Sequence, residues 1–206
     1  MEYFSGLLLG LAMILPIGPQ NIFVLTQGLT GGYKRGLAAA VTAGFCDTTL
    51  ILAGAGGLAA VLTGWPWLRT VLLVVGSLFL FYLGINYLRD SSTVEMGAAA
   101  TTAGDLETEE HWLRPLILYG IGVSWGNPHA ILDTVAVLGS AIAAYDPAMR
   151  VPFAAGVLSA SWLFFFTLVL VGQLLRERIT GQAQIWIKRI SGVIMLIFGV
   201  VLGLEG

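Results

Sequence analysis

Long stretches without a charged side chain constrain the fold of this chain more than any other feature. Residues 3–33, 70–88, 151–175 and 190–204 carry no charge at all. Two more long apolar stretches hold a single charged residue each, Asp47 in one and Asp133 in the other. A helix that spans a bilayer needs about 20 mostly apolar residues. The sequence therefore predicts an all-α polytopic membrane protein.

We predict six transmembrane helices, at residues 3–27, 36–62, 67–88, 115–140, 152–174 and 185–204. Charged residues make up 11% of the chain, less than half of the usual share in soluble domains, as expected if most of the chain faces lipid. The last helix has the weakest signal, because its charge-free part has 15 residues and Lys188 and Arg189 must snorkel at its end. A five-span topology with a peripheral first or last helix is the alternative.

Basic residues in the loops predict the orientation. The loops after the first, third and fifth predicted helices contain eight of the ten Lys and Arg residues, and the opposite side contains Arg69 and Arg150. The eight are Lys34, Arg35, Arg89, Arg114, Arg176, Arg178, Lys188 and Arg189. By the positive-inside rule, these loops are cytoplasmic and both termini are periplasmic or extracellular. The expected location is the bacterial inner membrane, with lipid around the helices.

A change in composition divides the chain into two similar halves. Residues 90–114 contain small and polar residues and an acidic stretch from Asp105 to Glu110, so they predict a polar cytoplasmic linker. Residues 1–89 and 115–206 then form two units of three helices each. An odd number of membrane crossings inverts the second unit relative to the first. The predicted architecture is two inverted three-helix repeats.

Both units begin with a helix that is interrupted at a proline motif. Pro16 to Asn21 reads PIGPQN, and Ser124 to His129 reads SWGNPH. Interrupted helices in matching positions of inverted repeats are the best sequence indication of a binding site near the middle of a transporter. The alternative is that both are simple kinks, since proline and glycine are common in membrane helices.

The two motifs predict helix starts inside the membrane. Gly18-Pro19 and Asn127-Pro128 each read as an N-cap followed by the first residue of a new half-helix. Free N–H groups at such a start carry a partial positive charge, which suits a carboxylate ligand. Because proline lacks an N–H, carbonyl groups before each break also need new partners, from protein or from a water-filled cavity.

The two isolated aspartates supply the opposite charge. A charge at the centre of a bilayer costs roughly 2.5–3.5 kcal/mol, so Asp47 and Asp133 are candidates for substrate binding and proton coupling. Asp133 lies five residues after Pro128, about 7.5 Å along an ideal helix. That distance suits an extended basic amino acid with its carboxylate at the break. The alternative is a neutral carboxyl group with a structural hydrogen bond, to Thr48, Thr49 or another helix in the case of Asp47.

Polar residues beside the breaks have two interpretations each. His129 precedes Asp133 by four residues, so the pair is predicted to share a helix face and to relay protons, to form a structural hydrogen bond, or, least favoured, to bind a metal. Gln20 and Asn21 either contact substrate or form hydrogen bonds between helices.

Several other functions find no support in the sequence. The net charge of −2 and the lack of a basic cluster argue against a nucleic-acid partner. Cys46 is the single cysteine, and no paired Cys/His spacing indicates a metal site. No HExxH motif and no cluster of histidines is present, so neither enzyme activity nor a cofactor is expected. Small-residue runs at residues 38–40 and 54–57 permit close helix packing, including packing in a homo-oligomer.

The two motifs resemble those of a known family. Gly6 to Gly28 (GLLLGLAMILPIGPQNIFVLTQG) and Trp125 to Gly139 (WGNPHAILDTVAVLG) are similar to the lysine exporter (LysE) family, most of all to its branch for basic amino acids. The similarity extends along nearly the whole chain. Gly126 departs from the pattern, because a larger residue is expected there.

The resemblance implies export of L-lysine or L-arginine by proton antiport. The residues that match the motifs of the family are Gly18, Pro19, Gln20, Asn21, Asn127, Pro128 and Asp133, with Asp47 as a looser match. In the expected mechanism Asp133 exchanges a proton for the cationic substrate, with Asp47 and His129 as further proton-coupling candidates. Export of other amino acids, or of a metal or inorganic cation, is the alternative.

Overall fold

Every described element of the chain is a helix. The computed structural model describes residues 1–16, 18–57, 66–89, 112–127, 131, 133–176 and 181–205. The elements are α1 (Glu2–Ile14), α2 (Pro19–Thr30), α3 (Gly32–Ala55), α5 (Pro66–Arg89), α6 (Leu113–Trp125), the π-helix η1 (Asp133–Leu138), α8 (Gly139–Ala144), α9 (Pro147–Arg176) and α10 (Gly181–Glu205). Within those residues there is no strand, which confirms the predicted all-α class.

The predicted helices correspond closely to the observed ones. Residues 36–62, 67–88, 152–174 and 185–204 match α3, α5, α9 and α10, although α3 already ends at Ala55, before a turn in which Gly57 has a φ of 95°. The two predicted helices with proline motifs are divided, into α1 and α2 and into α6 and η1 with α8. The first division is sharp, because α1 and α2 are bent by 84° relative to each other.

The lengths of the helices suit a membrane. Among the described residues, α3 and α9 are long and apolar enough to cross a bilayer, and the bent pair of α1 and α2 adds a third span if it counts as one. α5 and α10 have 24 and 25 residues, and α5 contains a shorter apolar stretch at Leu73–Asn86. Helices of 24 residues are roughly 36 Å long, more than the ~30 Å of a hydrocarbon core. The count of six spans stays a prediction.

Apolar side chains fill the interior and also cover the outer surface. The larger core cluster includes Phe23 of α2, Leu80 of α5 and Phe165 of α9, which are at most 1% exposed. On the outside, Leu8 of α1 and Leu163 of α9 are 68% and 58% exposed. So much exposed apolar surface is not expected of a soluble protein and suits contact with lipid.

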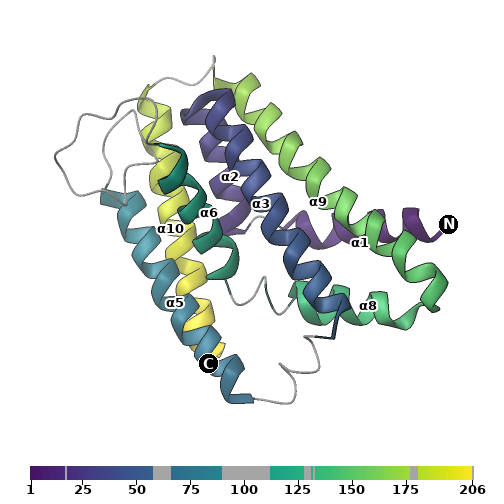
Figure 1. Ribbon diagram of the computed structural model, residues 1–206. Coiled ribbons are helices and arrows are strands. Elements are labelled where there is room, and N and C mark those ends of the chain that lie inside the picture. The colour runs from purple at the N-terminus through teal and green to yellow at the C-terminus, as the bar shows by residue number, and fades with distance from the viewer. Residues whose placement is uncertain are drawn as a thin grey trace.

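Each half of the chain packs its broken helix against the long helix of the other half. α1 lies on α9, where the position of Gly10 leaves room for the backbone of Val157. η1 and α8 lie on α3, where Gly139 adjoins the carbonyl group of Gly54. α5 and α10 lie side by side on the other flank of the bundle (Figure 1). Glycine at these contacts lets helix backbones approach closely.

The basic ends of the helices gather at one end of the bundle. The turn between α2 and α3, the end of α9 and the start of α10 lie at the top of Figure 1, the start of α6 lies just below them, and the end of α5 lies at the upper left. The guanidinium group of Arg176 lies against Gly32, whose φ is 82°. The guanidinium carbon of Arg35 lies 5.6 Å from the ring centroid of Trp112, at the start of α6.

Candidate functional site

The first break in the chain separates α1 from α2. Gly18 has an extended backbone, with φ −106° and ψ 176°, and it is the N-cap of α2. Pro19 is the first helical residue, and the carbonyl of Gly18 accepts the N–H of Ile22 at 3.0 Å. Proline suits this place because its fixed φ matches the helix and its missing N–H has no partner to lose. The predicted helix start at Gly18-Pro19 is confirmed.

Asn21 connects the two sides of this break. Its Nδ2 donates to the carbonyl oxygen of Ile14 at 2.9 Å and to that of Pro16 at 3.0 Å. The side chain is 8% exposed. The last carbonyls of a helix lack partners within the helix, and water is scarce in a membrane. The Asn21 amide therefore supplies hydrogen-bond donors to carbonyls at the break, as predicted. These are the carbonyls of Ile14 and Pro16, and not the ones that lose a donor because Pro16 and Pro19 have no N–H.

The carboxyl group of Asp47 faces the first turn of α2. Gln20 Nε2 donates to Asp47 Oδ1 at 2.9 Å and approaches the Ala43 carbonyl oxygen at 3.4 Å. On the α9 side, Ser161 also contacts this carboxyl group. The hydroxyl groups of Thr48 and Thr49 donate to carbonyls of their own helix, α3. The acid is therefore held by other helices rather than by its neighbours in sequence.

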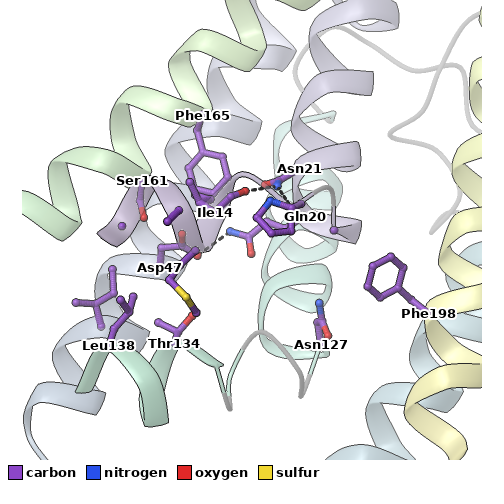
Figure 2. A pocket seen from close by; sticks show the side chains of 16 residues that line it. Ile14, Gln20, Asn21, Asp47, Asn127, Thr134, Leu138, Ser161, Phe165 and Phe198 are labelled. Atoms are coloured by element: carbon purple, nitrogen blue, oxygen red, sulfur yellow. Dashed lines mark hydrogen bonds between the residues drawn. The ribbon is translucent and has the colours of Figure 1, made fainter. Parts of the chain in front are cut away.

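A cavity of about 290 Å³ lies between these groups. It is lined by Gly10, Ala12, Met13, Ile14, Pro16, Gly18, Gln20, Asn21, Asp47, Ile51, Asn127, Thr134, Leu138, Ser161, Phe165 and Phe198. In Figure 2, Asp47, Thr134, Leu138 and Ser161 gather on one side, Asn127 and Phe198 lie on the other, and Gln20 lies between them. The volume is near the lower end for sites that hold small molecules.

The second break brings Asn127 to the same cavity. α6 ends at Trp125, and the N–H of Gly126 donates to the carbonyl of Gly122 at 2.7 Å. The carbonyl of Asn127 accepts the N–H of Ile131 at 3.1 Å, which parallels the bond from Ile22 to Gly18 at the first break. Asn127 is 6% exposed. Its backbone therefore behaves as the predicted N-cap does.

The structure describes the other predicted site residues near this break only in part. Pro128 and His129 lie outside the described residues. Asp133 is the first residue of η1, and its side chain also lies outside what is described. Because η1 is a π-helix, the spacing expected for an ideal α-helix does not apply beyond Asp133. Thr134 and Leu138, both in η1, line the cavity.

The predicted site residues are thus brought together in part. Gly18, Gln20, Asn21, Asp47 and Asn127 all line one cavity, although they come from three separate segments: the start of α2, α3 and the residues just after α6. Pro19 is buried at the start of α2 but is not among the lining residues. Their role in binding remains a prediction.

Several lining residues are not among the predicted ones. Ser161 carries a usable signal, because it is a polar residue within the charge-free stretch 151–175. Phe165 and Phe198 carry none, since aromatic residues in apolar helices are common packing residues. Thr134 directly follows Asp133, a predicted site residue, so the sequence already pointed to this part of the chain.

The unexpected glycine of the second motif has a structural explanation. A side chain at Gly126 would collide with the ring of Phe79 and with the Gly122 carbonyl. Phe79 comes from α5 and also lies against Gly122. The ring of Phe79 therefore occupies the space that the larger residue expected at position 126 would fill.

The cavity combines both signs of charge. Among the described residues that line it, Asp47 has the one ionisable side chain, and the start of α2 contributes the partial positive charge of a helix N-terminus. Amide and hydroxyl groups from Gln20, Asn127 and Ser161 add donors and acceptors. Within the part of the chain that is described, no three His, Cys, Asp or Glu side chains gather as metal ligands would. The arrangement suits a small molecule with a cationic and an anionic group.

Comparisons with known proteins agree with the resemblance of the motifs. The family description "LysE type translocator" matches residues 11–206. The chain is 38% identical to the arginine exporter protein ArgO of Enterobacter sp. (strain 638), over 99% of this chain and 94% of that protein. It is 37% identical to the arginine exporter protein ArgO of Escherichia coli (strain K12), with the same coverage of both. No solved structure matches the chain.

A match over almost the whole length, together with relatives at this level of identity, establishes the family. The chain belongs to the LysE family of translocators and is a membrane protein.

Proposed function

We propose that this protein exports basic amino acids, L-arginine or L-lysine, across the bacterial inner membrane. The observation that carries the proposal is the carboxyl group of Asp47, which faces a cavity and is the one ionisable group among the described residues that line it. An isolated acid among apolar helices is costly, and its usual purpose is to bind an ion or a charged substrate. The relatives named as arginine exporters support the same class of substrate.

The cavity offers a binding mode for such a substrate. The α-carboxylate would accept hydrogen bonds from the N–H groups at the start of α2, next to Gly18. The cationic side chain would then pair with Asp47, where charge-assisted hydrogen bonds are strongest. Gln20 occupies Asp47 Oδ1 in the structure described, so it would share this carboxyl group with the substrate or rotate away from it. Asn127 and Asp133 complete the proposed site from the second half.

Alternating access would arise from the two inverted repeats. The exchange of half-helices between the halves supports this, because α1 packs on α9 while η1 and α8 pack on α3. Both breaks border one cavity, so a tilt of one half against the other would open the cavity to alternate sides of the membrane. The expected division is residues 1–89, linker 90–114, and residues 115–206.

Proton antiport would drive the export. Moving a cation out of a cell that is negative inside costs about 2.3 kcal/mol per charge per 100 mV, and an inward proton would offset this. Asp133, Asp47 and His129 are the candidates for the proton, with Asp133 first because it follows the second break. An acid that holds either a proton or a cationic substrate would couple the two movements.

The loop charges support an orientation with both termini outside the cytoplasm. The basic ends of α5 and α9 and the basic start of α3 lie together at one end of the bundle (Figure 1), which we assign to the cytoplasm.

Transport by the purified protein in liposomes tests the proposal. Vesicles are loaded in parallel with arginine, lysine, leucine, glutamate or a divalent metal ion, and release is followed with and without an inward proton gradient. We expect the release of arginine or lysine to rise with the gradient, and the release of the other compounds to stay at the level of protein-free vesicles. Release of leucine or of the metal ion alone would instead support the alternative substrates.

A further inference from the structure

The amide of Asn21 has a different task from that of its neighbour Gln20. Gln20 points toward α3 and Asp47, whereas Asn21 points back to the end of α1 (Figure 2). We propose that Asn21 is a positioning residue: it clasps α1 to α2 and thereby holds Gln20 and the start of α2 in place around the substrate. This inference rests on the proposed function, because it concerns the same cavity.

The chemistry of the amide fits a clasp. An Asn side chain has two N–H donors on one nitrogen, and the two contacts of Asn21 Nδ2 are both to carbonyl oxygens of the break. No further N–H of this amide is left to donate to a substrate carboxylate. Carbonyl groups can only accept, so the amide nitrogen, and not its oxygen, must face Ile14 and Pro16.

The clasp acts on the site through the first turn of α2. Gly18, Pro19, Gln20 and Asn21 are consecutive in the chain. Gly18 has an extended backbone and borders open space, since a Cβ added there would meet no atom within 4 Å. The turn therefore depends on its other contacts for its position. Asn21 supplies two hydrogen bonds to α1, which itself is fixed on α9. Loss of the clasp should loosen Gln20 and the N–H groups beside Gly18.

The substitution Asn21→Asp separates a clasp from a contact with the cationic group of the substrate, and the modification rate of Leu15→Cys, described below, separates it from a contact with the substrate carboxylate. Above neutral pH the new carboxylate can only accept, and it faces two carbonyl oxygens, so the clasp opens. At low pH the protonated group donates one hydrogen bond and partly restores it. We expect arginine self-exchange at about pH 8 to be slower than in the unmodified protein by about tenfold, mostly through a higher KM, and the difference to shrink to about threefold near pH 5.5.

The opposite dependence on pH would overturn the proposal. If the side chain at position 21 touched the cationic substrate, the carboxylate of Asn21→Asp would attract it, KM would fall at high pH, and protonation would weaken binding. A difference that does not vary with pH would also contradict the clasp. Self-exchange with equal pH on both sides removes the proton gradient, and each rate is divided by that of the unmodified protein at the same pH.

The normalisation accounts for the other titratable groups. Asp47 of α3 is the one that faces the cavity within the described chain, while α9 contributes Ser161 and Phe165 and α10 contributes Phe198. His129 and Asp133 are present in both proteins that are compared. Asn21→Leu serves as the control that does not titrate, and it should be impaired to a similar degree at both pH values.

A measurement that needs no transport keeps the clasp apart from the proposed function. Leu15 lies at the break and is 60% exposed, so Leu15→Cys reports on it, while the native Cys46 is buried. We expect a water-soluble maleimide to modify Leu15→Cys several-fold faster when Asn21→Asp is present at about pH 8, and no faster at low pH. Unchanged modification rates would contradict the clasp. If the modification rates followed the expected dependence on pH but the protein exported no arginine, only the proposed function would be contradicted.

Discussion

The two breaks in the chain start alike and then continue differently. At the first, Gly18 caps α2, a regular helix of 12 residues that is buried along almost its whole length. At the second, Asn127 makes the corresponding backbone bond, but a π-helix of six residues follows and then the short helix α8, which is partly exposed. The acids differ as well, since Asp133 belongs to the broken helix itself whereas Asp47 lies on the next helix.

This difference suggests that the two breaks of the approximate repeat have different functions. The first break is held by the Asn21 clasp and by the surrounding helices, so it suits a fixed binding surface around Asp47. The second contains a π-helix, a form that is rare, less favourable and often found at functional sites. We therefore propose that the first break chiefly recognises the substrate and that the second chiefly couples the proton.

The largest effect is expected from Asp47→Asn. It removes the charge that would pair with the substrate while preserving the shape and the contact with Gln20. Loss of one partner of a desolvated charge pair costs about 2–5 kcal/mol, so arginine export should fall by at least about thirtyfold. The rate of arginine efflux from liposomes measures this loss. Asp146→Asn is the matched control, because Asp146 is exposed and Asn also caps helices well. Equal losses in both variants would argue against a specific role for Asp47.

The contact that holds the second break on α3 can be tested by overpacking. Gly139 is buried, and a Cβ there would lie 2.7 Å from the backbone of Gly54. Gly139→Val should lower the stability by about 1–3 kcal/mol, measured by unfolding in detergent. Ser140→Val, at the next and exposed position, should change it little. If both variants unfold alike, this packing does not anchor the second break.

Asp133→Asn tests whether coupling belongs to the second break. If Asp133 carries the proton, export driven by an inward proton gradient should fall by about tenfold, equivalent to about 1.4 kcal/mol. Arginine self-exchange without a gradient should be much less affected, because the Asp47 side of the cavity remains intact. Gradient-driven export at the normal rate would eliminate Asp133 as the coupling residue.

The smallest effect is expected at the cap of the first break. Gly18→Ser keeps an extended backbone, finds open space for its side chain, and adds an oxygen that accepts from the first turn of α2. Serine caps helices better than glycine by a few tenths of a kcal/mol, so thermal unfolding should shift slightly upward. A clear loss of stability would show that Gly18 is needed for its flexibility.

The sequence predicted what depends on local chemistry. The charge-free stretches located the helices, and Gly18-Pro19 located the start of α2 to the residue. It did not predict that Gln20 would meet Asp47, because that contact joins residues 27 positions apart on separate helices. Nor did it predict η1, which no motif marks, or the Phe79 ring beside Gly126, since both depend on packing between distant segments.

Binding of arginine and citrulline to the purified protein tests the central claim most directly. Citrulline has nearly the shape of arginine but no charge on its side chain, so the two differ at the group that should meet Asp47. We predict that the protein binds arginine at least about thirtyfold more tightly than citrulline, and that Asp47→Asn reduces this preference to about threefold or less. An undiminished preference for arginine in Asp47→Asn would contradict the account.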